Sequence, residues 1–149
     1  MKNIFIAIGD NRKRSEIATL AQNIGFRLIN AISPSTYISP TARLGEGVAI
    51  MPGVMINPDS KIEDNAIINT GSTIDHDCVI SKNVHIAPGC SLAGNVKIEE
   101  GTFLGIGCKV IPEITVGQWS IIGAGSVILN NIPPHSKAFG NPARVRETV

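Results

Sequence analysis

The sequence predicts a mainly β fold, a β-helix built from six-residue repeats, with a small α/β piece at its N-terminus. The first observation is that every sixth residue from Ile38 to Ile128 is Ile, Leu or Val, at sixteen positions without a miss. The second is that the position four residues after each of these holds only Ala, Val, Ile, Ser, Thr or Cys. A fixed period of six with one large and one small inward position is typical of stacked hexapeptide coils, and neither an α-helix nor a hairpin strand repeats at six.

The turn residues support the same period. If three hexapeptides close one coil, residues 18 apart in the sequence stack on one another. Three columns at that spacing consist almost entirely of Gly, Asn and Asp, which tolerate the left-handed backbone that a tight corner needs. The columns are Gly53, Gly71, Gly89, Gly107, Gly125; Gly47, Asn65, Asn83, Gly101; and Asp59, Asp77, Asn95, Glu113, Asn131. Sixteen hexapeptides make about five coils, roughly 25 Å tall at the spacing of stacked strands.

The residues before the repeats predict a strand, a helix and a second strand. Residues 2–8 (KNIFIAI) form an apolar run of a strand's length. Apolar side chains within residues 15–24 have the spacing of an amphipathic helix face, so we expect a helix from about Asn11 to a cap at Gly25. Residues 26–32 (FRLINAI) are expected to form the second strand, followed by a short linker.

Three parts are therefore expected along the chain. Residues 1–35 form a partial α/β piece, residues 36–133 form the β-helix, and residues 134–149 form a C-terminal tail that runs extended along the surface. The front piece is too small to carry a core of its own. It resembles the second half of a nucleotide-binding α/β domain, and no G-x-G-x-x-G stretch precedes it. We therefore expect the chain to be either a fragment or a shortened member of its class.

Composition argues against several classes of protein. The net charge is +1 and the basic residues are dispersed, which does not favour binding to nucleic acid or to an anionic membrane. No apolar run has the length of a membrane span and the N-terminus does not have the pattern of a signal peptide, so a cytoplasmic location is expected. Cys78, Cys90 and Cys108 all lie on the small inward column, where they are expected to be buried packing residues.

One histidine has features that packing does not explain. His76 lies between Asp75 and Asp77, just outside the core column, and adjacent carboxylates can raise the basicity of an imidazole and fix its tautomer. Gly94 stacks against it one coil later, which leaves room and a backbone N–H. Two other interpretations stay open: His76 as a solvated surface side chain, and Asp77 as a turn residue alone.

The histidine spacing does not favour a metal site. His76 and His85 are nine residues apart, and His135 lies beyond the repeats. The γ-class carbonic anhydrases share a β-helix and bind zinc through three histidines, two of which are closer in sequence than His76 and His85 are here. We therefore expect no metal.

Several stretches together resemble a known family, the sialic-acid O-acetyltransferases and nucleotide-amino-sugar N-acetyltransferases. These enzymes are left-handed β-helix, acetyl-CoA-dependent hexapeptide acyltransferases. The resemblance is most specific over residues 66–127. The stretches that carry it are NTGSTIDHDC (69–78), HIAPG (85–89), LAGNV (92–96), FLGIG (103–107), IGAGSV (122–127), GNPAR (140–144) and, in the front piece, FIAIGDN (5–11).

The resemblance implies roles for the residues at the centre of these stretches. His76 would be the general base, taking a proton from the sugar amine or hydroxyl as that group attacks the thioester, and Asp77 would raise its basicity. His85 and the backbone N–H of Gly94 would lie at the acetyl group and the thioester. An N–H in a tight turn is a suitable donor to the oxyanion that such a transfer forms.

The resemblance also implies the remaining contacts and the assembly. Backbone groups at Ile106 and Ala124 would hold the pantetheine arm of acetyl-CoA, and Gly9 would contact the sugar nucleotide. The protein would be a homotrimer with each active site between two neighbouring β-helices, and no metal would take part.

One departure from the family affects the acceptor. Members carry a glycine-rich loop and an acidic pair at the start of their N-terminal domain, and neither stands in this sequence. We expect acetyl-CoA binding on the coils to survive this difference, whereas acceptor binding depends on the front piece. The expected acceptor is a nucleotide-linked amino sugar of bacterial surface-glycan biosynthesis. The alternatives are sialic-acid O-acetylation and a non-catalytic trimeric scaffold.

Overall fold

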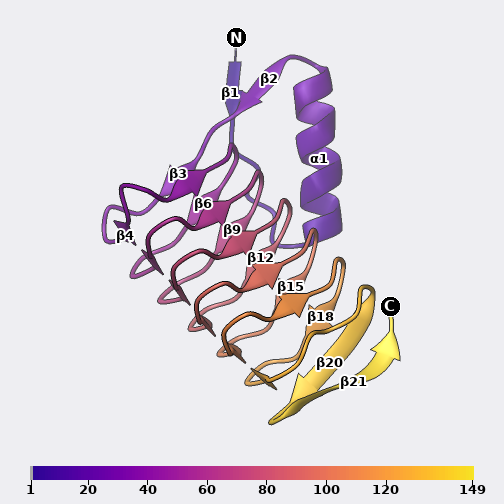
Figure 1. Ribbon diagram of the computed structural model, residues 1–149. Helices are drawn as coiled ribbons and strands as arrows, with labels where there is room; N and C mark the ends of the chain where they lie inside the picture. The colour runs from indigo at the N-terminus through magenta and orange to yellow at the C-terminus, as the bar shows by residue number, and fades with distance from the viewer. Residues whose placement is uncertain (1) are drawn as a thin grey trace.

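The computed structural model describes residues 2–149, and its main part is a stack of parallel coils with three faces (Figure 1). The eight-stranded face consists of β3 (Ala31–Ile32), β6 (Ala49–Ile50), β9 (Ile67–Ile68), β12 (His85–Ile86), β15 (Phe103–Leu104), β18 (Ile121–Ile122), β20 (Ser136–Gly140) and β21 (Ala143–Thr148). The six-stranded face consists of β4 (Tyr37–Ile38), β7 (Met55–Ile56), β10 (Thr73–Ile74), β13 (Ser91–Leu92), β16 (Lys109–Val110) and β19 (Val127–Ile128). The five-stranded face consists of β5 (Arg43–Leu44), β8 (Lys61–Ile62), β11 (Val79–Ile80), β14 (Lys97–Ile98) and β17 (Thr115–Val116).

The register of these strands confirms the predicted period. Thr73 pairs with Ser91 in the next coil and with Met55 in the previous one, so partners are 18 residues apart. The aliphatic residue of each hexapeptide points inward, and from Ile50 to Ile128 these side chains are at most 3 % exposed. They pack against the small column, Cys78, Cys90 and Cys108 included, as one continuous core. The predicted β-helix is therefore confirmed.

Polar residues of the small column hydrogen-bond within the core. The Ser72 hydroxyl donates to the Ala87 carbonyl at 2.9 Å, and the thiols of Cys78 and Cys90 point at the carbonyls of Ala93 and Gly105 at 3.2 Å. Each acceptor lies 15 residues ahead, so the repeat itself supplies the partner that a buried polar group needs.

The corners have the predicted left-handed backbone. Positive φ angles recur through the Gly, Asn and Asp columns, for example 57° at Asp77 and 59° at Asn95. Trp119 is an exception in residue type, because a bulky side chain rarely adopts its φ of 53°. It stands one coil after Gly101, in the column that otherwise holds only Gly and Asn.

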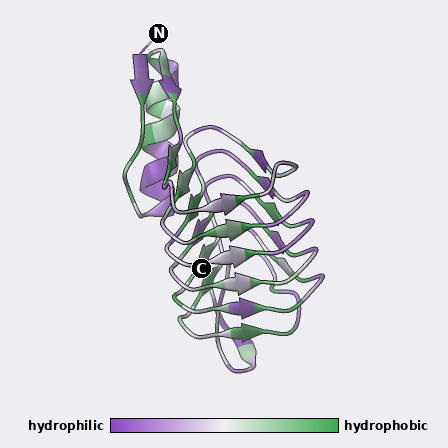
Figure 2. Cartoon of the chain, turned by 90° about the vertical axis from the view of Figure 1, so that its left-hand side faces the viewer, coloured by the Kyte–Doolittle hydropathy of each residue, from purple (hydrophilic) through white to green (hydrophobic). Residues whose placement is uncertain are grey.

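The residues before β3, here called the front unit, lie at the first coil and extend along the side of the stack (Figures 1 and 2). Its strands β1 (Lys2–Ile4) and β2 (Phe26–Leu28) pair in parallel, and helix α1 (Asn11–Asn23) connects them. Asp10 caps the helix by accepting a hydrogen bond from the Lys13 N–H at 2.7 Å. The helix is too short and too polar to cross a membrane, and it is the only helix in residues 2–149.

One expectation about strands was wrong. Residues 26–32 form two strands, because Ile32 is already in register with the hexapeptides and β3 pairs with β6 in the first coil. The coils thus begin at Ala31, before the boundary expected at residue 36. The C-terminal residues form the extended strands β20 and β21; β20 pairs with β18, and the buried Ala138 takes the inward position of another repeat.

Candidate active site

His76 lies at an outer corner of the stack, where residues 75–78 connect β10 to β11. Its Nδ1 is 2.8 Å from Oδ2 of Asp77, and the two side chains are 53 % and 51 % exposed. Asp77 can reach the imidazole because its left-handed backbone turns the corner at that residue. The turn role and the contact with His76 are thus properties of the same side chain, as the sequence allowed.

The surroundings make His76 a stronger base. The hydrogen bond that His76 donates to Asp77 raises the pKa of His76 above its ordinary value of 6.5. Desolvation acts against this rise, and the negative charges of Asp75 and Asp77 add to it. Since a carboxylate accepts hydrogen bonds, the imidazole carries its proton on Nδ1 and leaves Nε2 free. Asp75 is held in turn by the Asn57 amide at 2.9 Å and by the His76 N–H, which lower its pKa.

Gly94 packs directly against this imidazole. A Cβ atom at Gly94 would lie 2.5 Å from Cε1 and 2.6 Å from Nε2 of His76, so only glycine leaves the ring in place. The two corners are joined by a hydrogen bond from the Asn95 N–H to the His76 carbonyl at 3.0 Å. The N–H of Gly94 donates no hydrogen bond to any part of residues 2–149.

This unused N–H belongs to a position that recurs in every hexapeptide, two residues after the inward aliphatic. The position faces outward, and proline, which has no N–H, occupies it five times: Pro40, Pro52, Pro58, Pro88 and Pro112. Elsewhere a side-chain oxygen often accepts the N–H, as Asp75 does for His76. At Ile106 and Ala124, as at Gly94, the described chain supplies no acceptor. The N–H groups of Ile106 and Ala124 are available to a ligand that runs along their shared corner, and the N–H of Gly94 is available at another corner.

His85 and Gly9 lie together, but on a different side of the coil from His76. His85 is in β12 on the eight-stranded face, and its Nδ1 is 3.2 Å from the Gly9 carbonyl. Burial lowers the pKa of His85, and the charge of Arg14 adds to this, while the Gly9 carbonyl acts against it. Its Nε2 is 3.4 Å from the Asn69 amide nitrogen.

The predicted site residues therefore occupy three places in one chain. His76, Asp77 and Gly94 lie at the corner between the six- and five-stranded faces. Ile106 and Ala124 stack at the corner between the eight- and six-stranded faces, and His85 and Gly9 lie where the front unit meets the eight-stranded face. One copy of the chain does not bring these three groups into a single site.

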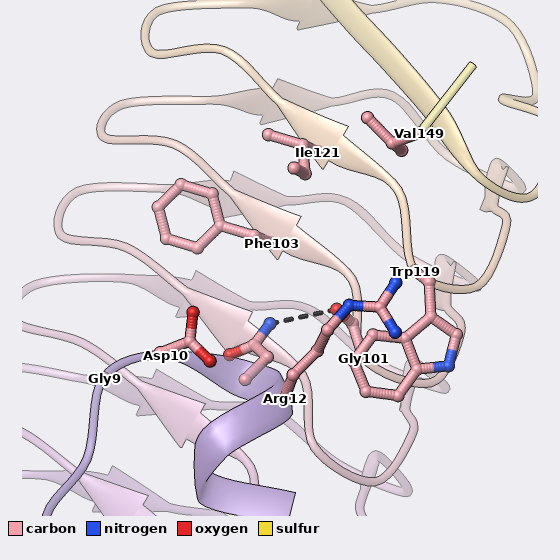
Figure 3. Close-up of a pocket in the computed structure, with 9 residues that line it drawn as sticks. Gly9, Asp10, Arg12, Gly101, Phe103, Trp119, Ile121 and Val149 are labelled. Carbon is pink, nitrogen blue, oxygen red and sulfur yellow. Dashed lines mark hydrogen bonds between the residues drawn. The ribbon is translucent and has the colours of Figure 1, made fainter.

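A pocket of about 360 Å³ opens beside Gly9, between the start of α1 and the eight-stranded face (Figure 3). Phe103, Ile121 and Trp119 form its apolar wall, and the Arg12 guanidinium lies 4.5 Å from the centre of the Trp119 ring. Its lining residues are Gly9, Asp10, Asn11, Arg12, Gly101, Phe103, Trp119, Ile121 and Val149. The pocket combines a planar apolar surface with a positive charge.

Sequence reasoning missed three residues around these sites: Arg14, Asn57 and Trp119. A signal existed for Arg14, because it stands four and seven residues before Ala18 and Ala21 on the buried helix face. Asn57 stands 18 residues before Asp75 and could have been found from the stacking rule. Nothing in the pattern of the column predicts a tryptophan at the corner position that Trp119 occupies.

The described residues offer no cluster suited to a metal ion. Within residues 2–149, no group of three or more His, Cys, Asp or Glu side chains converges in this way. Burial raises the pKa of the Cys78 thiol to about 11, so this thiol is not available as a thiolate at neutral pH. The chemistry that the geometry supports is proton transfer and hydrogen bonding to a bound ligand.

The hexapeptide coils, together with the similarity to known proteins described next, show that the chain belongs to the bacterial hexapeptide transferase family. The fold of this family is the left-handed parallel β-helix. The family model for the bacterial transferase hexapeptide (six repeats) matches residues 41–76 and 95–130. The similarity to solved structures extends over nearly the whole chain, and the resemblance inferred from the sequence motifs is confirmed.

Three solved structures illustrate this similarity. PerB from Caulobacter crescentus, in complex with CoA and GDP-perosamine, is 49 % identical with a TM-score of 0.97, over 98 % of this chain and 70 % of that one. The acetyltransferase domain of PglB from Neisseria gonorrhoeae, in complex with acetyl coenzyme A, is 38 % identical with a TM-score of 0.94, over 97 % and 70 %. WeeI from Acinetobacter baumannii is 29 % identical with a TM-score of 0.93, over 97 % and 71 %. The comparison with curated proteins found no match.

Proposed function

We propose that the protein transfers the acetyl group of acetyl-CoA to the amino group of a nucleotide-linked sugar, in bacterial surface-glycan biosynthesis. Solved relatives support the two ligand classes, since one is in complex with CoA and GDP-perosamine and another with acetyl coenzyme A. Two further structures are of a perosamine N-acetyltransferase in which a single histidine is replaced by asparagine or alanine. These two replacements support a functional role for that histidine in that enzyme.

The observation that carries the proposal is the corner at which His76, bonded to Asp77, packs against Gly94. In the proposed reaction, His76 Nε2 takes the proton of the attacking amine as the new N–C bond forms at the thioester carbonyl. The C–S bond then breaks, and His76 returns the proton to the departing sulfur. A positioned base of this kind contributes about 10²- to 10⁴-fold to the rate.

The free N–H groups fit the other needs of the reaction. Gly94 can donate to the oxyanion that develops beside His76, which is a contribution of about 10²–10³ in rate for a well-placed donor. Ile106 and Ala124 stack one coil apart and can donate to the amide carbonyls of a pantetheine arm along the corner. The chain therefore offers donors for the thioester and for the pantetheine arm of acetyl-CoA.

The proposed assembly is a homotrimer with a shared site. His76 and His85 lie on opposite sides of one coil, so a site that uses both needs His76 from one copy and His85 from its neighbour. Light scattering tests this part, because a monomeric mass at assay concentration would remove the shared site.

The pocket beside Gly9 is the proposed entry for the acceptor. Trp119 and Phe103 offer flat apolar surfaces, and Arg12 offers a charge suited to a phosphate. The acceptor and acetyl-CoA are metabolites of the cytoplasm, where we propose that the reaction takes place.

Two measurements test the proposal. Calorimetric titration with acetyl-CoA should show binding, and a panel of nucleotide-linked amino sugars should reveal one that drives consumption of acetyl-CoA. A folded chain that does not bind acetyl-CoA would support a non-catalytic scaffold instead. Turnover of free sialic acid but of no nucleotide-linked amino sugar would support O-acetylation.

A further inference from the structure

Arg14 is a buried cation in the first turn of α1, and only 1 % of its surface is exposed. Its Nε donates to the Asn65 carbonyl at 2.9 Å, and its Nη2 donates to the Asn83 carbonyl at 2.9 Å and to Oδ1 of Asn11 at 2.8 Å. Its Nη1 donates to the carbonyls of Ile8 and Gly9, both at 3.0 Å. No carboxylate within residues 2–149 forms an ion pair with it.

The guanidinium thus joins three parts of the chain: the helix, the loop before it and two successive coils. Such an arrangement needs a planar fork of donors, which arginine has and lysine lacks. Burial lowers the pKa of Arg14 to about 10, so the side chain stays charged at neutral pH. Burying the guanidinium charge costs desolvation free energy. The hydrogen bonds that its N–H groups donate to carbonyl oxygens offset that cost.

The Gly9 carbonyl links Arg14 to His85. The same oxygen accepts from Arg14 Nη1 at 3.0 Å and lies 3.2 Å from His85 Nδ1. A carbonyl can only accept, so His85 carries its proton on Nδ1. Its Nε2 is then a lone pair, directed toward the Asn69 amide at 3.4 Å. The ring is also held by an edge contact with Phe103, the centroids being 5.2 Å apart.

We propose that Arg14 is a positioning residue, which anchors the Gly9 carbonyl and thereby fixes His85 as the neutral Nδ1–H tautomer. His85 then presents a hydrogen-bond acceptor at Nε2, suited to an N–H of the acceptor amine or of the pantetheine arm. The functional part of this inference rests on the proposed acetyltransferase reaction. The tautomer itself is a property of the protein alone.

The test is ¹⁵N–¹H correlation of the histidine rings at neutral pH, without ligand, in the wild type, Arg14→Met and Lys13→Met. Lys13 is the matched control, since it is an exposed cation on the same helix turn. We expect the Nδ1–H form for His85 in the wild type and in Lys13→Met. In Arg14→Met we expect a mixture of tautomers and a kcat reduced about tenfold.

Several outcomes would overturn the inference. One is an Nε2–H tautomer in the wild type, which decides the matter even if Arg14→Met does not fold. Another is a folded Arg14→Met that keeps the wild-type His85 signals, because Arg14 would then only fasten the helix. If no acceptor is ever turned over, the proposed reaction fails while the tautomer result still stands.

Discussion

His76 and His85 are nine residues apart, yet their surroundings shift their pKa values in opposite directions. His76 is half-exposed at a corner, and the carboxylate of Asp77 raises its pKa. His85 is more buried against the front unit, and desolvation and the Arg14 cation lower its pKa. A pair of titratable groups pushed apart in this way is a common sign of separate chemical roles. One imidazole is suited to accept a proton, and the other to stay neutral.

The difference follows from where the hexapeptide repeat places each residue. His76 stands two residues after an inward aliphatic, at a position that points into solvent at a corner. His85 stands one residue before such an aliphatic, on the flat of β12, where the front unit covers it. Moving a residue by a few places along one repeat therefore changes its exposure, its partner and its protonation.

The largest expected effect is that of His76→Ala. Removing the base should lower kcat at least about 10²-fold. The melting temperature should change little, since an exposed side chain makes few packing contacts. Steady-state kinetics and thermal unfolding measure the two.

His135→Asn is the control for that variant. His135 has a φ of 56°, which asparagine also tolerates, and it is not among the residues that line the pocket beside Gly9. It should retain full activity. Full activity in His76→Ala would contradict the assignment of His76 as the general base.

Gly94→Ala should have the next largest effect. The added Cβ would occupy the space of Cε1 and Nε2, so the imidazole must swing away from Asp77. We expect kcat to fall about 10- to 100-fold, the range that a misplaced catalytic group produces. The N–H of residue 94 is retained, and the exposed ring can move without a large loss of stability.

A double-mutant cycle isolates this steric cause. If Gly94→Ala acts by displacing the imidazole, it should have almost no further effect on kcat in a His76→Ala background. A full additional loss there would show that residue 94 acts independently of His76.

Asp77→Asn should have a smaller effect, about tenfold or less in kcat, together with a shift in the pH profile. His76 must be unprotonated to act as a base, so its raised pKa places the acidic limb of kcat/KM above the ordinary histidine value. Without the carboxylate, the pKa of His76 falls and the limb moves to lower pH.

Asp59→Asn is the matched control for Asp77→Asn. Asp59 occupies the same corner one coil earlier, with a φ of 61°, and it has no histidine beside it. Asparagine tolerates both corners, so both variants should unfold near the wild-type temperature. An unchanged pH profile in Asp77→Asn would leave Asp77 with its turn role alone.

The repeat explains why so much of the stack could be predicted from sequence. A period of six determines the inward residue, the corner and the 18-residue partner at once, as the pairing of Thr73 with Ser91 illustrates. The same 18-residue spacing predicts from the sequence alone that Gly94 stacks against His76. The front unit follows no such rule. The prediction of a single strand over residues 26–32 was wrong because the first part of this apolar run pairs with β1 and the last part pairs with β6.

Contacts between the front unit and the coils were not predictable in the same way. Arg14 stands in the run Asn11-Arg12-Lys13-Arg14, in which three consecutive cationic side chains have different surroundings. The helical spacing from Ala18 and Ala21 indicates that Arg14 is on the buried face, but only the docking of α1 decides which carbonyls of the coils it contacts. His85 likewise owes its tautomer to a carbonyl 76 residues away in sequence.

The smallest expected effect is on the pH dependence of the protein's stability, to which His85 contributes. Its folded pKa lies below the ordinary value of 6.5, so in the window between the two the unfolded chain binds more protons than the folded one. The contribution of neutral His85 is therefore complete above pH 6.5 and is lost as the pH falls through the folded pKa. His85→Asn keeps a donor for the Gly9 carbonyl and cannot titrate. The melting temperature of the wild type should thus fall more steeply than that of His85→Asn on acidification below pH 6.5. Parallel curves would mean that His85 titrates alike in the folded and unfolded chains, and the contrast with His76 would then rest on Asp77 alone.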